Sequence, residues 1–151
     1  MGSLKRLDVI SPALSDLFRK GTDTQRNQAM FVACRIAMTD AKLSGARIDA
    51  ALELLMAGAT NDGVAREMNA LEIEFDDQYF SLSDDDETIT PEAQVFFHKA
   101  RAAAALAYAL SPDRSEQNEG LYEAISASND TDKTIEIVKE SFSDRMNDGS
   151  Q

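Results

Sequence analysis

Apolar residues recur every three or four positions along most of the chain, which is the spacing of one face of an α-helix. The clearest such segment starts at Thr90, which can accept hydrogen bonds from a first helical turn, and continues with Pro91, whose missing N–H costs nothing there. From Ala100 to Leu110 almost every residue is apolar, and seven of these residues are alanine. A helix that is apolar around nearly its whole circumference has to be buried on most sides. We therefore predict that Thr90–Leu110 is the central helix of an α-helical bundle.

The same periodicity predicts helices before and after this segment. The predicted helices are, in chain order, a short one after Ser11-Pro12, one at residues 23–42, one from Ser44 to Gly58, one at residues 64–82, the central helix, one from Ser115, and a last one with Ile135, Val138 and Phe142 on one side. We find no alternating run convincing enough for a strand, although residues 72–80 contain enough Ile, Phe and Tyr to suggest one. The chain is predicted to be all-α, a single domain over residues 1–151 with about six to seven helices. Met1–Ser3 is consistent with an expression-tag remnant, and residues 147–151 are expected to fray.

The helix predicted at residues 64–82 combines an apolar stripe with many acids. Its stripe consists of Val64, Met68, Leu71, Phe75, Tyr79 and Leu82, with Ile73 and Phe80 beside it. We expect the stripe to face the bundle while much of the charge faces water. Residues 81–88, with the acidic run Asp84–Glu87, are predicted to form a loop.

The net charge of −12 is concentrated in one part of the 151-residue chain. Ten acids and no Lys, Arg or His lie between Glu67 and Glu92, so the other 17 acids face 15 bases and the rest of the chain carries only −2. Such a segment disfavours binding of nucleic acid or an anionic membrane through this face.

Residues with catalytic or metal-binding chemistry are scarce. Cys34 lies in an apolar helical pattern and is expected to be a small core residue. His98, the only histidine, precedes Lys99 and Arg101 on the central helix, where a half-exposed histidine is favoured over a catalytic arrangement with Cys34. One Cys and one His cannot form a structural zinc site, and the run Asp84–Glu87 has neither the spacing nor the glycine of an EF-hand. A solvated acidic loop is the favoured interpretation of that run, with cation binding left open. The glycines form no phosphate-binding loop. We expect no enzymatic activity, no cofactor and no metal.

The compartment is predicted from the same sparse features. A single cysteine favours a reducing environment, and Asp8 and Pro12 interrupt any signal-peptide core. No apolar run approaches the ~20 residues of a membrane span. We expect a cytoplasmic protein.

Aromatic residues lie among the acids of the segment between Glu67 and Glu92 and make it a candidate binding surface. Aromatic side chains are frequent anchors of interfaces, and complementary charge speeds encounter, so a basic protein is the partner that this surface favours. The alternative is that Phe75 and Tyr79 belong to the core and the acids form a solvated face. The predicted partner-binding residues are Glu72, Asp76, Asp77, Tyr79, Phe80, Asp84, Asp85, Asp86 and Glu87.

Three stretches of the chain also carry a family resemblance. They are NQAMFVACRIAMTDAKLSGARIDAALELL (residues 27–55), FHKARAAAALAYALSPD (residues 97–113) and LYEAISASND (residues 121–130). Together they resemble small, acidic, all-helical bacterial proteins of the immunity type, which are encoded beside toxin domains. The resemblance implies a stoichiometric inhibitor that covers the active site of a toxin, and it assigns no functional residue.

These observations lead to one functional hypothesis and two alternatives. We expect a non-enzymatic protein-binding domain, of the immunity type, that neutralises a basic toxin through its acidic surface. The first alternative is a structural or scaffolding helical domain that self-associates into a homo-oligomer. A small-molecule enzyme is the third hypothesis.

Overall fold

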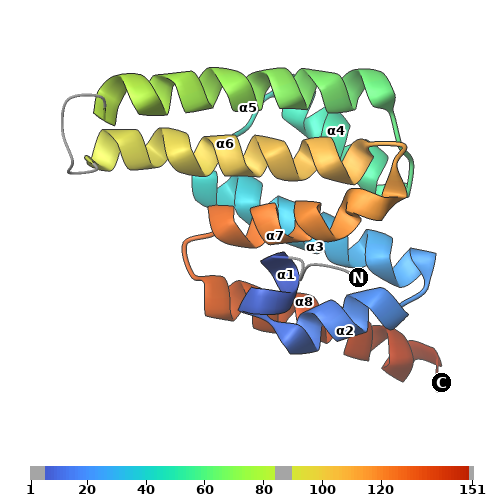
Figure 1. Ribbon diagram of the computed structural model, residues 1–151. Helices are drawn as coiled ribbons and strands as arrows, with labels where there is room; N and C mark the ends of the chain where they lie inside the picture. Colours follow the sequence, from blue (N-terminus) through green and yellow to red (C-terminus); the bar gives the residue numbers. More distant parts are fainter. Residues whose placement is uncertain (1–5, 84–89, 150–151) are drawn as a thin grey trace.

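The computed structural model describes residues 6–83 and 90–149, and within these ranges the chain is helical, without a strand (Figure 1). The elements are α1 (Arg6–Ile10), α2 (Pro12–Lys20), α3 (Asp23–Ala41), α4 (Ala46–Met56), α5 (Asp62–Ser83), α6 (Pro91–Leu110), the 3-10 helix η1 (Arg114–Glu116), α7 (Gln117–Ala127) and α8 (Thr131–Gly149). The all-α prediction is confirmed. Helix α8 continues to Gly149 and so includes residues 147–149 of the tail expected to fray, while residues 150–151 lie outside the described residues. Met1–Ser3 lies outside the described residues.

Five of the described helices begin with a side-chain cap, and Asn61 and Asp130 provide those of α5 and α8. The hydroxyl of Ser11 accepts the Leu14 N–H at the start of α2, and Thr90 accepts the Ala93 N–H at the start of α6. Thr22 forms a capping box at the start of α3. The helix predicted to begin at Ser44, with the Ser44 side chain as its cap, instead has Gly45 at the N-cap of α4, with a φ of 124° and no side-chain cap. Only glycine adopts that backbone conformation without strain. The start of α4 therefore depends on the backbone conformation of Gly45 and not on a side-chain hydrogen bond.

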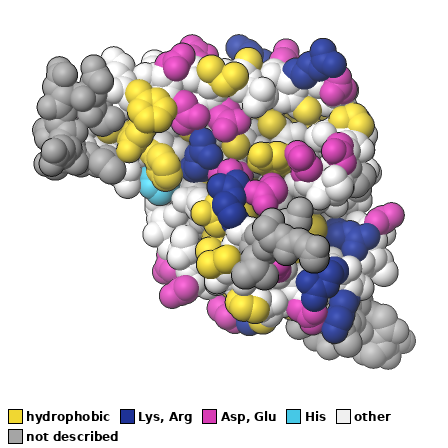
Figure 2. All heavy atoms as spheres, viewed as in Figure 1, with side chains coloured by type: hydrophobic (Ala, Val, Ile, Leu, Met, Phe, Trp, Pro, Cys, Tyr) yellow, Lys and Arg dark blue, Asp and Glu magenta, His cyan; other side chains and the backbone are white. Residues whose placement is uncertain are grey.

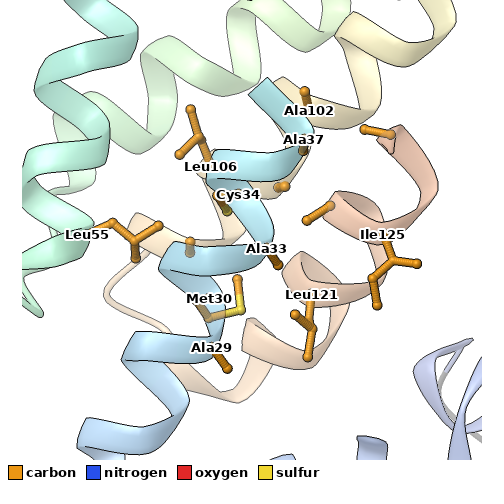
Figure 3. Packing of buried hydrophobic residues seen from close by; sticks show 14 of the residues in the cluster. Ala29, Met30, Ala33, Cys34, Ala37, Leu55, Ala102, Leu106, Leu121 and Ile125 are labelled. Atoms are coloured by element: carbon orange, nitrogen blue, oxygen red, sulfur yellow. The ribbon is translucent and has the colours of Figure 1, made fainter. Parts of the chain in front are cut away.

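Helix α6 is the central helix, as the alanine-rich pattern predicts. It lies between α5 on one side and α7 on the other, and it also packs against α3 and α4 (Figure 1). Its buried residues are Ala93, Ala100, Ala102, Ala103, Ala104, Ala105, Leu106, Ala109 and Leu110. In Figure 3, side chains of α3 point toward Leu106 of α6 and toward Leu121 and Ile125 of α7. The core is therefore formed where α3, α6 and α7 meet.

Gly120 lets α7 approach α6 closely. A Cβ atom placed on Gly120 would lie 2.9 Å from the Tyr108 Cβ and 3.0 Å from the Met30 Cε, which is too close for ordinary packing. Glycine costs helix stability compared with alanine, and in the sequence it weakens the prediction of α7. The structure shows what the glycine provides, which is space for the contact between the two helices.

Helices α5 and α6 form an antiparallel hairpin whose outer half extends beyond the rest of the bundle (Figure 1). Because α5 packs mainly on α6, its apolar stripe is buried at Met68 but only partly buried at Phe75 and Tyr79. Leu82, which we expected to face the bundle, is 41% exposed. The hairpin thus presents residues of the predicted binding segment away from the core.

No described helix has both the length and the apolar composition needed to cross a membrane.

Candidate protein-binding site

A partly buried arginine, Arg101, organises the inner half of the hairpin. Arg101 is the only charged residue between Ala100 and Leu110, and its guanidinium donates to Glu123 of α7 over 3.0 Å. Its other terminal nitrogen lies 3.3 Å from oxygens of both Glu72 and Asp76 of α5. A charge on an otherwise apolar helix must be paired when it is buried, and here one guanidinium is shared among three carboxylates.

This arrangement changes the role of two predicted site residues. We expected much of the charge on α5 to face water, whereas the side chains of Glu72 and Asp76 are only 23% and 31% exposed and lie against Arg101. The sequence separates these acids from Arg101 by 25 residues or more, so their pairing depends on the packing of α5 on α6. Their negative charge is partly neutralised and contributes less to a binding surface than the sequence suggests.

Glu123 connects this cluster to the N-terminal helix. It is 3% exposed and accepts hydrogen bonds from Arg101 through one oxygen and from Arg6 through the other, at 2.8 Å. Arg6 also donates to Glu119 and lies over the ring of Tyr122, with its guanidinium carbon 4.3 Å from the ring centroid. Neither Arg6 nor Glu123 was a candidate in the sequence. The signal that could have found the cluster is the lone charge of Arg101 in an alanine-rich helix.

Burial and neighbouring carboxylates shift the pKa values in this cluster. The pKa of Glu72 is raised, mainly by burial and further by the negative charges of Asp76 and Glu123, although Arg101 opposes the shift. Burial acts to lower the pKa of Arg101, but the surrounding carboxylates more than offset it and the net shift is upward. The cluster thus holds a permanently charged cation beside more negative charge than that cation compensates.

Aromatic rings form the outer half of the hairpin. Tyr79 of α5 packs against Phe97 of α6, with ring centroids 5.7 Å apart, and it touches the Phe80 ring edge-on at 5.2 Å. Nearby, Phe75 and Phe96 pair at 6.3 Å. Tyr79 is therefore a packing residue of the hairpin, in agreement with the structural alternative for that residue.

Phe80 points the other way and is 63% exposed. Ile73 is 54% exposed, and Asp77, also exposed, lies between these two residues in the sequence of α5. Among the described residues, neither Asp77 nor Glu74 forms an ion pair. Hydrophobic side chains gather on the visible face of the hairpin toward its outer end, with acids beside them (Figure 2). Ile73 was placed beside the stripe in the sequence but was not predicted to bind a partner.

The remaining predicted site residues, Asp84, Asp85, Asp86 and Glu87, lie outside the described residues. Whether this run binds a cation therefore stays an open alternative. Within the described residues, no group of three or more His, Cys, Asp and Glu side chains is placed to hold a metal ion.

The two side chains considered for nucleophilic chemistry lie in structural surroundings. Cys34 is fully buried in the core, and its burial raises the pKa of the thiol to about 12, so the thiol stays protonated at neutral pH. The Nδ1 atom of His98 lies 3.0 Å from the carbonyl oxygen of Ala127, which fixes the ring between α6 and the end of α7.

A cavity of about 530 Å³ lies among α1, α2, α3 and α7, away from the hairpin. Its lining includes Arg19 and Arg26, which pair with Asp16 and Asp23 respectively. Gln117 also lines it, and its side-chain nitrogen has no hydrogen-bond partner, but that atom is closed off from solvent. The cavity therefore presents mainly polar groups that are already engaged or out of reach.

No protein-family model matches the chain, and neither a curated protein nor a solved structure is similar to it. We therefore infer the function chiefly from the side chains that the hairpin exposes.

Proposed function

We propose that this protein is a non-enzymatic protein-binding domain that takes a basic protein partner on the outer half of the α5–α6 hairpin. The observation that carries the proposal is the exposure of Phe80 beside Asp77, whose carboxylate forms no ion pair with any described residue. A large apolar ring held in water by a well-formed helix contributes nothing to the core, and such rings are common anchors of interfaces.

Charge supports a basic partner over a second copy of the same chain. Glu74 and Asp77 are exposed and unpaired among the described residues, and the chain as a whole carries −12. A second copy would bring like charges together at this face, whereas a basic partner would be attracted to it. The self-associating scaffold is therefore the second candidate, favoured only by the exposed Ile73 and Phe80.

In biological terms, we propose an immunity-type inhibitor of a cognate bacterial toxin, such as one that acts on nucleic acids. The family resemblance of the alanine-rich helices supports it, together with the acidic character of the hairpin. Toxins that act on nucleic acids need basic clefts to hold phosphates, and an acidic hairpin with an exposed aromatic side chain is complementary to such a cleft. A cytoplasmic location belongs to the same proposal.

The test starts with the chain used as bait in extracts of its source cells. A captured protein is then produced in pure form, and its association and dissociation rates are measured at two salt concentrations. We expect Asp77→Lys to lower the association rate and Phe80→Ala to raise the dissociation rate, with association slowed by salt.

Matched controls lie on other faces of the molecule. Met56 of α4 is a similarly exposed apolar residue, and Glu140 of α8 is an exposed acid. Met56→Ala and Glu140→Lys are expected to leave both rates unchanged. Wild-type rates in both hairpin variants would overturn the proposal. A concentration-dependent dimer in sedimentation that disappears in Phe80→Ala would favour the scaffold instead.

A further inference from the structure

The outer face of α5 has a regular arrangement of apolar and acidic side chains. Ile73 and Phe80 are seven residues apart, so they point within ~20° of the same direction and lie ~10 Å apart along the helix axis. Asp77 lies between them on the same face, and Glu74 lies beside it. All four side chains are exposed.

This face has no partner within the described part of the chain. Helix α5 is the outermost layer of the bundle, and it packs on α6 through its opposite side, which carries Met68 and Phe75 (Figure 1). The buried side and the exposed side of one helix thus both carry apolar residues, and only one of them is covered.

We propose that the occupant of this face is a basic amphipathic α-helix of the partner protein, laid along α5. This inference rests on the proposed function and deepens it by naming the kind of segment that is bound. The first argument is the spacing. A helix presents side chains at i and i+7 at the same ~10 Å interval as Ile73 and Phe80, which is how helices in grooves place their anchors.

An extended segment fits this spacing less well. Side chains on one face of a strand lie ~6.7 Å apart, and the second neighbour on that face lies ~13 Å away. Neither distance matches the ~10 Å between Ile73 and Phe80. A partner strand would therefore meet one of the two apolar residues and miss the other.

The second argument is charge complementarity. Glu72 and Asp76 are already bound to Arg101, whereas Glu74 and Asp77 have no ion-pair partner in the described structure. Arg66, seven residues before Ile73 on α5, pairs with Asp62 one turn away. Lys or Arg residues beside the apolar stripe of the partner helix would meet the two unpaired acids.

Three labelled synthetic peptides of 21 residues test the inference by fluorescence anisotropy. The first peptide has Leu at positions spaced alternately three and four residues apart, so that Leu recurs every seven residues on one helical face. Its other positions are Lys or Arg. The second has the same composition in scrambled order, so that no apolar face forms. The third keeps the apolar spacing and replaces every base with Glu.

We expect the chain to bind the first peptide at least tenfold more tightly than either control peptide. Ile73→Ala and Phe80→Ala should each weaken binding of the first peptide about tenfold, the change that ~1.4 kcal/mol of lost contact produces. Met56→Ala and Glu140→Lys should leave it unchanged. The double variant Glu74→Lys with Asp77→Lys should no longer bind the basic peptide and should bind the acidic peptide instead.

Equal binding of the ordered and scrambled basic peptides would overturn the inference, because the face would then recognise charge without helical spacing. An unchanged affinity of the Ile73→Ala variant for the first peptide would also overturn the inference. Hydrogen exchange on the captured partner provides the second readout, since a bound helix shows protection over a continuous segment of two or more turns. If the partner still depends on Phe80 while its protected segment is not helical, the proposed function stands and the helix inference fails.

Discussion

Arg101 and Glu123 join α6 to α7 through a hydrogen-bonded ion pair of 3.0 Å at the edge of the core. Glu123 uses its second oxygen to hold Arg6, so one buried carboxylate connects three helices, α1, α6 and α7. Burying charge is costly, and a pair of this kind stabilises the fold only while both partners are present. The consequences of removing either partner can be measured.

Replacing Glu123 with Ala should destabilise the protein by about 3 kcal/mol, because it leaves two arginines without their shared partner. The loss lies at the lower end of the usual range since Arg101 keeps Glu72 and Asp76. Urea unfolding followed by circular dichroism measures the change. Asp16→Asn, which removes a surface pair with Arg19, serves as the control and should cost less than about 1 kcal/mol. A loss below that control would show that the buried pair is not needed.

Glu72 should make the protein more stable in mild acid. Because burial raises its pKa above 4.5, the native state holds a proton that the unfolded state has released, and stability falls as the pH rises through the folded pKa. The full stabilisation from this proton is reached once the pH lies below the pKa of Glu72 in the unfolded state. Glu72→Gln, which resembles the protonated form, should be at least as stable as the wild type at pH 7, and the difference between the two proteins should close toward pH 4.

The measurement for Glu72 is a series of denaturant midpoints between pH 4 and pH 8. Glu74→Gln, an exposed neighbour on the same helix, is the control for a general loss of negative charge. A Glu72→Gln variant that becomes steadily less stable than the wild type as the pH rises would show that its bond to Arg101 outweighs the burial of its charge.

Gly120→Ala should destabilise the protein although alanine is the better helix former. Alanine gains up to ~1 kcal/mol of helix propensity, but its Cβ would press on the Tyr108 Cβ and the Met30 side chain, and overpacking of a core costs roughly 1–3 kcal/mol. Thermal unfolding measures the net effect. The double variant Gly120→Ala with Met30→Ala relieves only the second of these contacts, so it separates the two sources of strain. A higher melting temperature for Gly120→Ala would mean that α6 and α7 are not in close contact.

Replacement by Ala should destabilise the protein at Tyr79 but leave its stability nearly unchanged at Phe80. Tyr79 packs against Phe97 within the hairpin, so its loss should cost roughly 1–3 kcal/mol of stability. Phe80 is largely exposed, so its loss should change stability by less than about 0.5 kcal/mol. Chemical denaturation of the two single variants checks both statements without any partner. If the two substitutions destabilise the protein equally, Phe80 contributes to packing and is not a free anchor for a partner.

The sequence by itself determines the helical architecture. The spacing of apolar residues every three or four positions, the caps at Ser11 and Thr90, and the alanine-rich segment of α6 each follow from local rules, because helix hydrogen bonds and amphipathic faces involve neighbours in the chain. The acidic segment and its aromatic residues are likewise visible without a structure. For these reasons the all-α class and the central helix were predictable.

Only the tertiary structure decided which of those acids and aromatic residues are free to bind. Glu72 and Asp76 are paired with Arg101 of the next helix, 29 and 25 residues away in the sequence, while Asp77 stays exposed. Tyr79 turns toward Phe97, and the adjacent Phe80 turns toward solvent. A helix sequence states which residues share a face, but which face is covered depends on the neighbouring helices. The single layer of α6 beneath α5 leaves the other face open.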